Sequence, residues 1–296
     1  MPETFLWYDL ETFGRDCRTS RISQFAGIRT DMALNPVAEP LSFYCRPSDD
    51  FLPEPEAALI TGITPQFASQ HGLCEADFMA RVHEQLSEPG TCALGYNSIR
   101  FDDEFIRFSL YRNFYDAYER EYAGGNSRWD LLDVMRMMYA VCPDALHWPL
   151  RDDGQPSFKL EHLAKANGCF EGEAHEALSD VRSLINLARK VRAAAPKLWQ
   201  HCLDLRDKNK VAGKLALHKN QRILHVSGQF PAAQACTGLM LPLMPHPLIK
   251  TRTLAVELRP EALKLIDYTA EQIERNIFTK TNQMPEGETR IGLQSV

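Results

Sequence analysis

Length, composition and charge exclude several classes of protein. The 296 residues are 44% hydrophobic and 24% charged, which is typical of a globular chain with more than one hydrophobic core. The net charge of −6 argues against binding nucleic acid over the whole surface, so any such contact must be local. We find no membrane-length apolar run, no signal peptide and no Cys-x-x-Cys pair among eight scattered cysteines, and we therefore expect a cytoplasmic protein.

The first part of the chain predicts a sheet covered by helices. Extended apolar runs predict strands at residues 5–11, 22–30, 41–46 and 91–96. Helices are predicted at residues 75–87, from about residue 102, and at 130–141, 158–166 and 174–193. Strands that open as a meander and then alternate with helices indicate an α/β fold.

The character of the sequence changes near Pro196, which we expect to end the last of these helices. Residues 206–222 carry a net charge of +5 (six basic residues minus one acid), and either a solvated linker or a track for phosphate groups explains them. Short apolar runs separated by glycine and proline then predict a small β-rich module, at 223–226, 239–241 and 254–256. We therefore predict two domains, at residues 1–196 and 197–296.

Two carboxylates end the first predicted strand. Asp9 and Glu11 are two residues apart, and alternate residues of a strand point to the same face of a sheet. The pair therefore predicts a platform for a divalent cation, although two solvent-facing acids at the end of a strand would give the same pattern.

Two further motifs supply acids and a histidine. Asp102 begins a helix directly after a strand, where it could equally be an N-cap. His175 and Asp180 are five residues apart, about 140° around a continuous helix, so both face one site only if His175 precedes the helix. A histidine there can take a proton from an attacking water, although a surface histidine beside an acidic helix start is the simpler explanation.

The four acids and the histidine have one chemistry in common if the fold gathers them. Carboxylates a few ångströms apart repel one another, and a pair of divalent cations is the natural compensation. Two such ions stabilise the attacking and leaving oxygens of a phosphoryl transfer. The three motifs together therefore predict phosphodiester hydrolysis.

In this order the motifs resemble those of the DEDDh 3′→5′ exonucleases, which are Asp-x-Glu, Asn-x-x-x-Phe-Asp and His-x-x-x-x-Asp. Further segments resemble the bacterial exonuclease I family, at residues 8–14, 60–65, 95–104, 126–133 and 156–163. The resemblance implies a ribonuclease H-like exonuclease domain, an SH3-like barrel and a helical C-terminal domain. Family members are longer than this chain, so we expect only part of the barrel, and no helical domain, to be present.

The resemblance also implies an activity. The family degrades single-stranded DNA from its 3′ end to 5′ mononucleotides in DNA repair and recombination, with two Mg²⁺ ions that Mn²⁺ can replace. It also implies contact with the bacterial single-strand-binding protein. Carried over to this sequence, the first metal would be held by Asp9, Glu11 and Asp180. Asp102 would help to hold the second metal, and His175 would be the general base.

The resemblance implies substrate contacts as well. Glu11, Thr12 and the turn at residues 60–64 would lie at the terminal nucleotide, and Lys159 would contact phosphate. Aromatic and basic residues interleave after Asp102, as binding of a single strand favours, although Phe114, Tyr118 and Tyr122 also have the spacing of a core stripe. With the resemblance, we expect strand contacts at Arg107, Tyr118, Tyr122 and Arg136.

Two alternatives stay open at this point. A DEDDh exoribonuclease that trims RNA 3′ ends would share every catalytic residue, because the choice of sugar depends on contacts to the 2′ position. A protein that binds single-stranded 3′ ends without cutting them would need the binding residues but not the catalytic ones.

Overall fold

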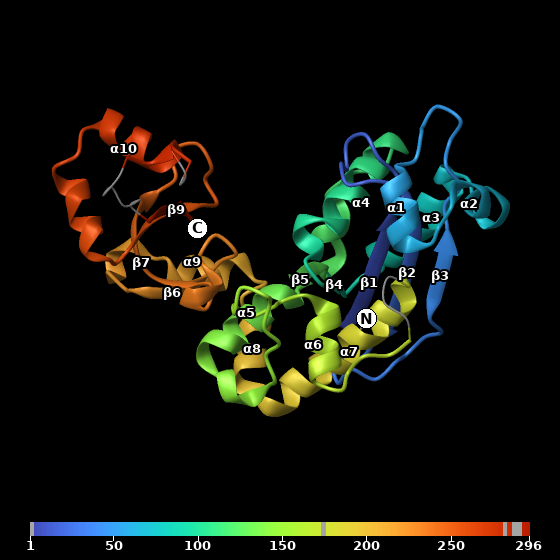
Figure 1. Ribbon diagram of the computed structural model, residues 1–296, viewed down its shortest axis with the longest axis horizontal. Coiled ribbons are helices and arrows are strands. Elements are labelled where there is room, and N and C mark those ends of the chain that lie inside the picture. Colours follow the sequence, from blue (N-terminus) through green and yellow to red (C-terminus); the bar gives the residue numbers. More distant parts are fainter. Residues whose placement is uncertain (1–2, 173–175, 281–282, 286–291) are drawn as a thin grey trace. The chain divides into compact units, whose positions relative to one another are not determined.

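The computed structural model describes residues 3–172, 176–280, 283–285 and 292–296, and the chain forms two compact units (Figure 1). The first unit is Met1–Arg206 and the second is Asp207–Val296. Each is built around a sheet of its own. Among the described residues, no helix is both long and apolar enough to span a bilayer.

The sheet of the first unit mixes antiparallel and parallel strands. Its order is β3-β2-β1-β4-β5. The strands are β1 (Thr4–Thr12), β2 (Ile22–Thr30), β3 (Leu41–Tyr44), β4 (Thr91–Gly95) and β5 (Ser127–Asp130). The first three strands form an antiparallel meander, and β4 and β5 extend the sheet in parallel with β1. The predicted α/β sheet is confirmed, and β5 escaped prediction because Trp129 is its only apolar residue.

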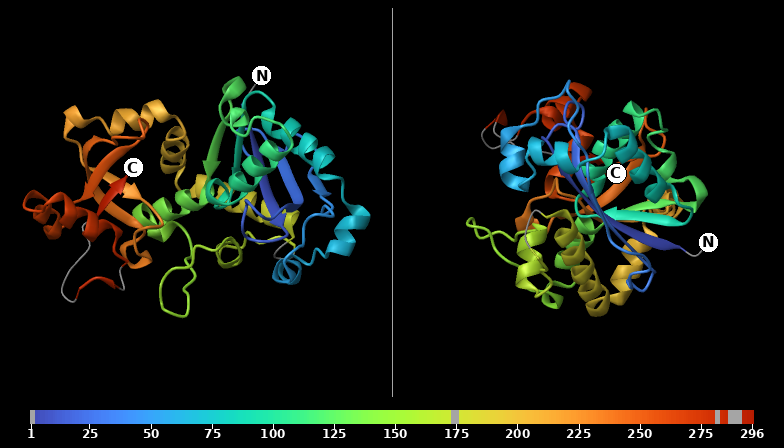
Figure 2. Two further views of the ribbon diagram at one scale, coloured as in Figure 1. Left: turned by 90° about the horizontal axis from the view of Figure 1, so that it is seen from above. Right: turned by 90° about the vertical axis from the view of Figure 1, so that its right-hand side faces the viewer.

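Helices cover both faces of this sheet, as the right-hand view of Figure 2 shows. On one face lie α5 (Leu131–Val141), α6 (Leu160–Ala166), α7 (Ala177–Ala194) and α8 (Pro196–Asp204). On the other lie α3 (Glu75–Ser87) and α4 (Asp102–Arg112). Two short helices, α1 (Pro55–Thr61) and α2 (Pro65–His71), are separated by Gly62, whose φ of 70° ends α1 in a left-handed conformation.

The alternation of side chains along β1 decides which residues face which helices. Trp7 packs into the core on the α7 face, whereas Leu6 and Tyr8 pack into the core on the α3 and α4 face. Asp9 and Glu11 continue the alternation of Trp7, so they point toward the α7 face. Helix α7 packs across β1 on that face.

The first unit continues beyond residue 196, where we predicted its end. Pro196 does not end the domain but begins α8, because proline fits the first turn of a helix, whose N–H groups have no intrahelical partner. Trp199 of this helix is buried against Trp129, with ring centroids 4.8 Å apart. This packing ties α8 to the first sheet, so the unit runs through Arg206.

The second unit contains an antiparallel sheet of order β6-β7-β8-β9. Its strands are β6 (Ile223–Val226), β7 (Thr237–Pro245), β8 (Thr253–Glu257) and β9 (Leu293–Ser295), around a small core that includes Phe230, Met240 and Ala255. Two helices accompany it, α9 (Lys208–Lys214) and α10 (Ala270–Phe278). The three predicted apolar runs lie in β6, β7 and β8, so the expected β-rich module is confirmed.

Candidate functional site

Three of the predicted metal ligands converge in the first unit. Asp9 and Glu11 come from β1, and Asp180 comes from the first turn of α7. Each offers an oxygen, and these oxygens all lie within 4.8 Å of one another. The convergence follows from the fold, because α7 packs across the face of β1 to which Asp9 and Glu11 point.

The start of α7 fixes the position of Asp180. Glu176 is the N-cap residue, and its carboxylate accepts hydrogen bonds from the backbone N–H groups of Leu178 and Ser179 at 3.4 and 2.8 Å. The backbone N–H of Asp180 donates to the carbonyl oxygen of Glu176 at 3.0 Å, which places Asp180 within the helix. His175, the predicted general base, lies outside the described residues.

Asp102 lies beside this group of three rather than within it. It is buried as the first residue of α4, and the N-cap position is taken by Phe101, so the N-cap explanation of Asp102 is wrong. Burial raises the pKa of Asp102 well above its usual value, and the charge of Asp103 raises it further. The backbone N–H of Leu10, which is next to Asp9 on β1, donates a hydrogen bond to the carboxylate of Asp102. This hydrogen bond lowers the pKa of Asp102 and so opposes the effect of burial.

The acids share an electrostatic problem that a cation would solve. Burial raises the pKa of Asp9 well above its usual value, and the charges of Asp102 and Glu11 add to the rise. Burial, followed by the charge of Asp180, raises the pKa of Glu11 to about 8. All the donors are carboxylate oxygens, the ligands that Mg²⁺ and Mn²⁺ prefer. The residues present therefore fit a divalent metal site.

Glu176 is a fifth acid whose part in the site was missed in the sequence. Its charge raises the pKa of both Asp9 and Glu11. In the sequence Glu176 belongs to the acidic helix start beside His175. Its spacing of four residues from Asp180 is the signal of a role in the site, because residues four apart are neighbours on one helical face.

Three of the predicted substrate contacts occupy separate positions. Thr12 is buried, and its hydroxyl donates to the carbonyl oxygen of Gly14 at 2.8 Å. Lys159 is exposed directly before α6. Arg136 donates to Asp133 at 2.8 Å, and its Nε is buried without a hydrogen-bond partner. Contact with a nucleotide stays a prediction for each of them.

Of the further predicted contacts, Arg107 lies in α4, and Tyr118 and Tyr122 lie beyond its end. The guanidinium group of Arg107 pairs with both Glu104 and Glu121, and its Cζ lies 4.9 Å from the ring centroid of Tyr118. Tyr118 and Tyr122 are 56% and 67% exposed, and Phe114 is fully exposed. The core-stripe explanation is therefore wrong, because these aromatic residues do not share one continuous helix. Contact with the strand stays a prediction for Arg107, Tyr118 and Tyr122.

Comparison with known families assigns both units. The family described as Exonuclease matches residues 6–188, and the family described as Exonuclease I SH3-like domain matches residues 206–296. The first match holds all four metal-ligand candidates, and the second begins one residue before the second unit.

Named relatives agree with this assignment. Exodeoxyribonuclease I of Escherichia coli (strain K12) is 45% identical over 276 residues, which are 93% of this chain and 58% of the relative. E. coli exonuclease I in complex with a dA16 oligonucleotide superposes with a TM-score of 0.95 at 42% identity, over 99% of this chain and 63% of that one.

Two further solved structures are similar over nearly the whole of this chain. One is the zinc-bound form of an E. coli ExoI–ssDNA complex, with a TM-score of 0.94 at 41% identity over 99% of this chain and 63% of that one. The other is an ExoI/SSB-Ct complex, with a TM-score of 0.94 at 41% identity over 100% of this chain and 63% of that one. This chain thus spans less than two thirds of the length of these relatives.

Proposed function

The chain belongs to the exonuclease I family, and on that premise we propose that it is a 3′→5′ exodeoxyribonuclease that degrades single-stranded DNA to 5′ mononucleotides. We propose that it acts in DNA repair and recombination, in the cytoplasm. The observation that carries the proposal is the convergence of Asp9, Glu11 and Asp180 within 4.8 Å, with Asp102 beside them.

The exonuclease family is metal-dependent, and we propose that this chain uses two Mg²⁺ ions, which Mn²⁺ can replace. Asp9, Glu11 and Asp180 would hold the first, and Asp102 would help to hold the second. When bound, such ions stabilise the negative charge that develops on the attacking and leaving oxygens. The carboxylates would release their protons as metal binds, because only the ionised form is a good ligand.

The protein's own groups would orient and deprotonate the reactants. We propose that His175 takes the proton of the water that attacks the terminal phosphodiester, a role that its spacing from Asp180 supports. Glu176 would keep Asp180 in place by capping α7. The leaving group would be the 3′ oxygen of the next nucleotide, so each turn of the reaction would release one 5′ mononucleotide.

The strand would be held by aromatic and basic side chains. The exposed rings of Tyr118 and Tyr122 can stack on bases, and Thr12 and Glu11 would contact the terminal nucleotide. Lys159 and Arg136 would contact phosphate groups. The lysines of α9 are exposed, and we propose that residues 206–222 form a track for phosphate groups.

The ExoI/SSB-Ct complex of a relative supports a protein partner. We propose that this chain, like the family, also contacts the bacterial single-strand-binding protein. Such a contact would bring the enzyme to single-stranded DNA.

Digestion of labelled oligomers tests the proposed activity. A single-stranded DNA oligomer labelled at its 3′ end should release labelled mononucleotide at once in Mg²⁺, and the same oligomer labelled at its 5′ end should shorten step by step. EDTA and the Asp180→Ala variant should each stop both reactions, and an RNA oligomer of equal length should be a poorer substrate. Cleavage that persists in Asp180→Ala, or that favours RNA, would contradict the proposal.

A further inference from the structure

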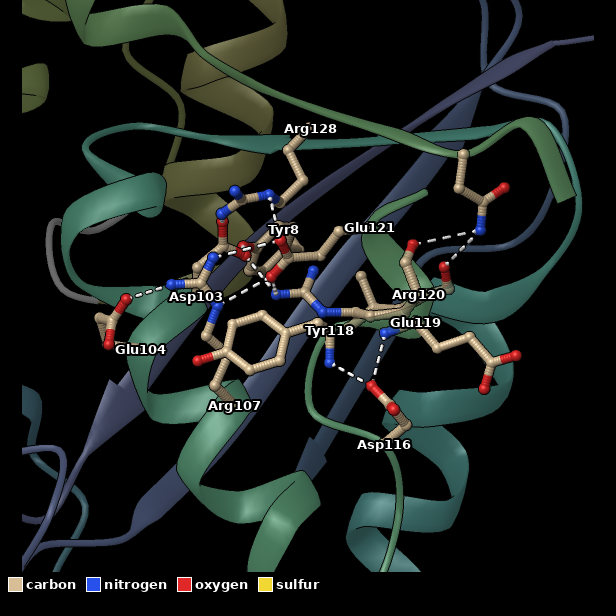
Figure 3. A network of polar contacts seen from close by, with 12 residues as sticks. Tyr8, Asp103, Glu104, Arg107, Asp116, Tyr118, Glu119, Arg120, Glu121 and Arg128 are labelled. Atoms are coloured by element: carbon tan, nitrogen blue, oxygen red, sulfur yellow. Dashed lines mark hydrogen bonds and ion pairs between the residues drawn. The ribbon is translucent and has the colours of Figure 1, made fainter. Parts of the chain in front are cut away.

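A cluster of paired charges surrounds the side chain of Asp103, the residue that follows Asp102 (Figure 3). It contains three arginines and three carboxylates, so its charges balance, and none of them is a proposed metal ligand. Its members are Asp103, Glu104, Arg107, Arg120, Glu121 and Arg128.

The centre of the cluster is the carboxylate of Asp103. Its Oδ1 accepts hydrogen bonds from the hydroxyl of Tyr8 at 2.8 Å and from Nη2 of Arg120 at 2.5 Å, and its Oδ2 accepts from Nη1 of Arg128 at 2.7 Å. The side chains of Asp103 and Arg120 are 2% and 0% exposed. Burial by itself would raise the pKa of Asp103, but the two arginines outweigh it and hold the pKa below its usual value.

Glu121 joins the centre to helix α4. One of its oxygens lies 2.9 Å from Nε of Arg128, on β5, and the other accepts from Nε of Arg107, on α4, at 2.8 Å. Arg107 also pairs with Glu104 in the first turn of the same helix. The cluster thus connects the edge of the sheet to the start of α4.

Asp103 and its hydrogen-bond partner Tyr8 are both sequence neighbours of metal-ligand candidates. Tyr8 precedes Asp9 on β1, and Asp103 follows Asp102 at the start of α4. The hydrogen bond between Tyr8 and Asp103 therefore ties together the two backbone segments that carry Asp9 and Asp102. It does so from the α3 and α4 face of the sheet, opposite the face to which Asp9 points.

The first turn of α4 has no side-chain cap. Its N-cap residue, Phe101, makes no side-chain capping hydrogen bond, whereas Glu176, Asp130 and Thr64 cap their helices with side-chain oxygens. A first turn without a cap loses a stabilising contact where the geometry of Asp102 must be held. The bonds of Asp103 supply the missing constraint one residue away.

We propose that Asp103, paired with Arg120 and Arg128 and bonded to Tyr8, positions Asp102 and Asp9 for metal binding. These are positioning residues, since they act through their neighbours. The inference rests on the proposed function, whose metal site it deepens. Groups that orient metal ligands from behind commonly matter nearly as much as the ligands, and buried ion pairs add little net stability by themselves.

Direct binding of Mn²⁺ to the intact chain tests the proposal without relying on catalysis. Asp103→Asn should weaken Mn²⁺ binding, measured by titration calorimetry, by roughly tenfold or more. Tyr8→Phe removes one hydrogen bond and keeps the packing of the ring, so it should weaken binding by a smaller factor. The melting temperature in EDTA is measured for each variant.

The ion pair of Arg112 with Glu75 provides a matched control. It joins the C-terminal end of the same helix to α3, away from Asp102, and Nε of Arg112 lies 3.1 Å from both carboxylate oxygens of Glu75. Glu75→Gln should lower the melting temperature in EDTA and leave the Mn²⁺ affinity unchanged. An equal loss of affinity in this control would overturn the proposal.

A double variant separates positioning from stability. Asp103→Asn leaves Arg120 buried with a neutral partner, and the Asp103→Asn/Arg120→Met variant removes that charge as well. The double variant should regain melting temperature but not Mn²⁺ affinity, and recovery of both together would overturn the proposal. If Asp103→Asn does not fold, this variant and Tyr8→Phe decide the question.

The same titrations distinguish failure of this inference from failure of the proposed function. The wild-type chain should bind Mn²⁺, and Asp180→Ala should lose that binding. If both hold while Tyr8→Phe and the double variant bind as the wild type does, only the positioning role is overturned. If the wild-type chain binds no Mn²⁺, the metal site itself is overturned, and the positioning role with it.

Discussion

Asp102 and Asp103 are adjacent, both buried, and electrostatic opposites. The pKa of Asp102 is raised by burial and by neighbouring acids, whereas the pKa of Asp103 is lowered because two arginines outweigh its burial. One carboxylate belongs to a site that the fold leaves short of positive charge. The other belongs to a site that the fold neutralises with its own side chains.

The difference extends to the residues around each carboxylate. Within the described residues, the ion pairs that hold Asp103 and Glu121 have no counterpart at Asp9, Glu11 or Asp102. Uncompensated acids in one place cost stability, and a fold tolerates them where an external cation supplies the compensation. The comparison therefore separates acids that serve the structure from acids that serve a metal.

The largest test of this comparison is Glu11→Gln. We expect the rate of single-stranded DNA degradation to fall on the order of 10³-fold, because a lost metal ligand removes several kcal/mol of transition-state stabilisation. In EDTA at about pH 9, above the pKa of about 8, the melting temperature should instead rise by about 2 °C, since one repelling charge is gone. A fall in melting temperature under these conditions would show that Glu11 supports the fold.

The opposite result is expected for Arg120→Met on the other side of the sheet. Removing a buried guanidinium group leaves Asp103 with one cation, which we expect to lower the free energy of unfolding by about 3 kcal/mol. Urea titration in EDTA measures this loss, with Glu75→Gln as the comparison in a partly exposed ion pair. A loss below about 1 kcal/mol, typical of surface pairs, would show that the cluster is not a buried network in solution.

Much of this arrangement could be predicted from the sequence. Strand periodicity predicts that Asp9 and Glu11 share a face, and an apolar strand before Asp102 predicts its place at the start of a helix. The helical periodicity of residues 174–193 predicts the position of Asp180 inside a helix. Local geometry decides each of these predictions, so they need no knowledge of the tertiary fold.

The cluster of paired charges around Asp103 could not be predicted in the same way. Arg120 and Arg128 are far from Asp103 in sequence, and ion pairs between separate elements carry no periodic signal. Arg107 shows the consequence, because its place among aromatic residues predicts contact with the strand, while its pairing with two acids has no signal in the sequence. The helix α8 was missed for a related reason, since a proline can begin a helix as well as end one.

The two sites also predict opposite responses to pH in the absence of metal. Folded Glu11 keeps its proton up to about pH 8, whereas the unfolded chain releases it near 4.5, so the folded state binds more protons between these values. The free energy of unfolding in EDTA should therefore fall as pH rises through this window, by up to about 1.4 kcal/mol per pH unit. Both Mg²⁺ and the Glu11→Gln variant should reduce this dependence of the free energy of unfolding on pH.

Asp103 gives the opposite dependence of stability on pH, in the acid range. Its pKa is lowered in the folded protein, so its contribution to stability is present above the usual pKa of 3.8 and is lost as pH falls below it. Denaturant titrations from about pH 3 to 9 would show both changes in the free energy of unfolding. A metal-free stability that rises steadily from pH 5 to 8 would contradict the assignment of Glu11.

The smallest expected effect, from Glu104→Gln, decides how the cluster acts. Glu104 is 38% exposed and pairs with Arg107, which keeps Glu121 as a partner, so we expect a stability loss below about 0.5 kcal/mol. The change adds the same net charge near Asp102 as Asp103→Asn does, but it leaves the bonds of Asp103 intact. If Mn²⁺ affinity is unchanged in Glu104→Gln and weakened in Asp103→Asn, the cluster acts through the placement of Asp102. If both variants weaken Mn²⁺ affinity equally, the metal site depends on the electrostatic field of the cluster and not on the placement of Asp102.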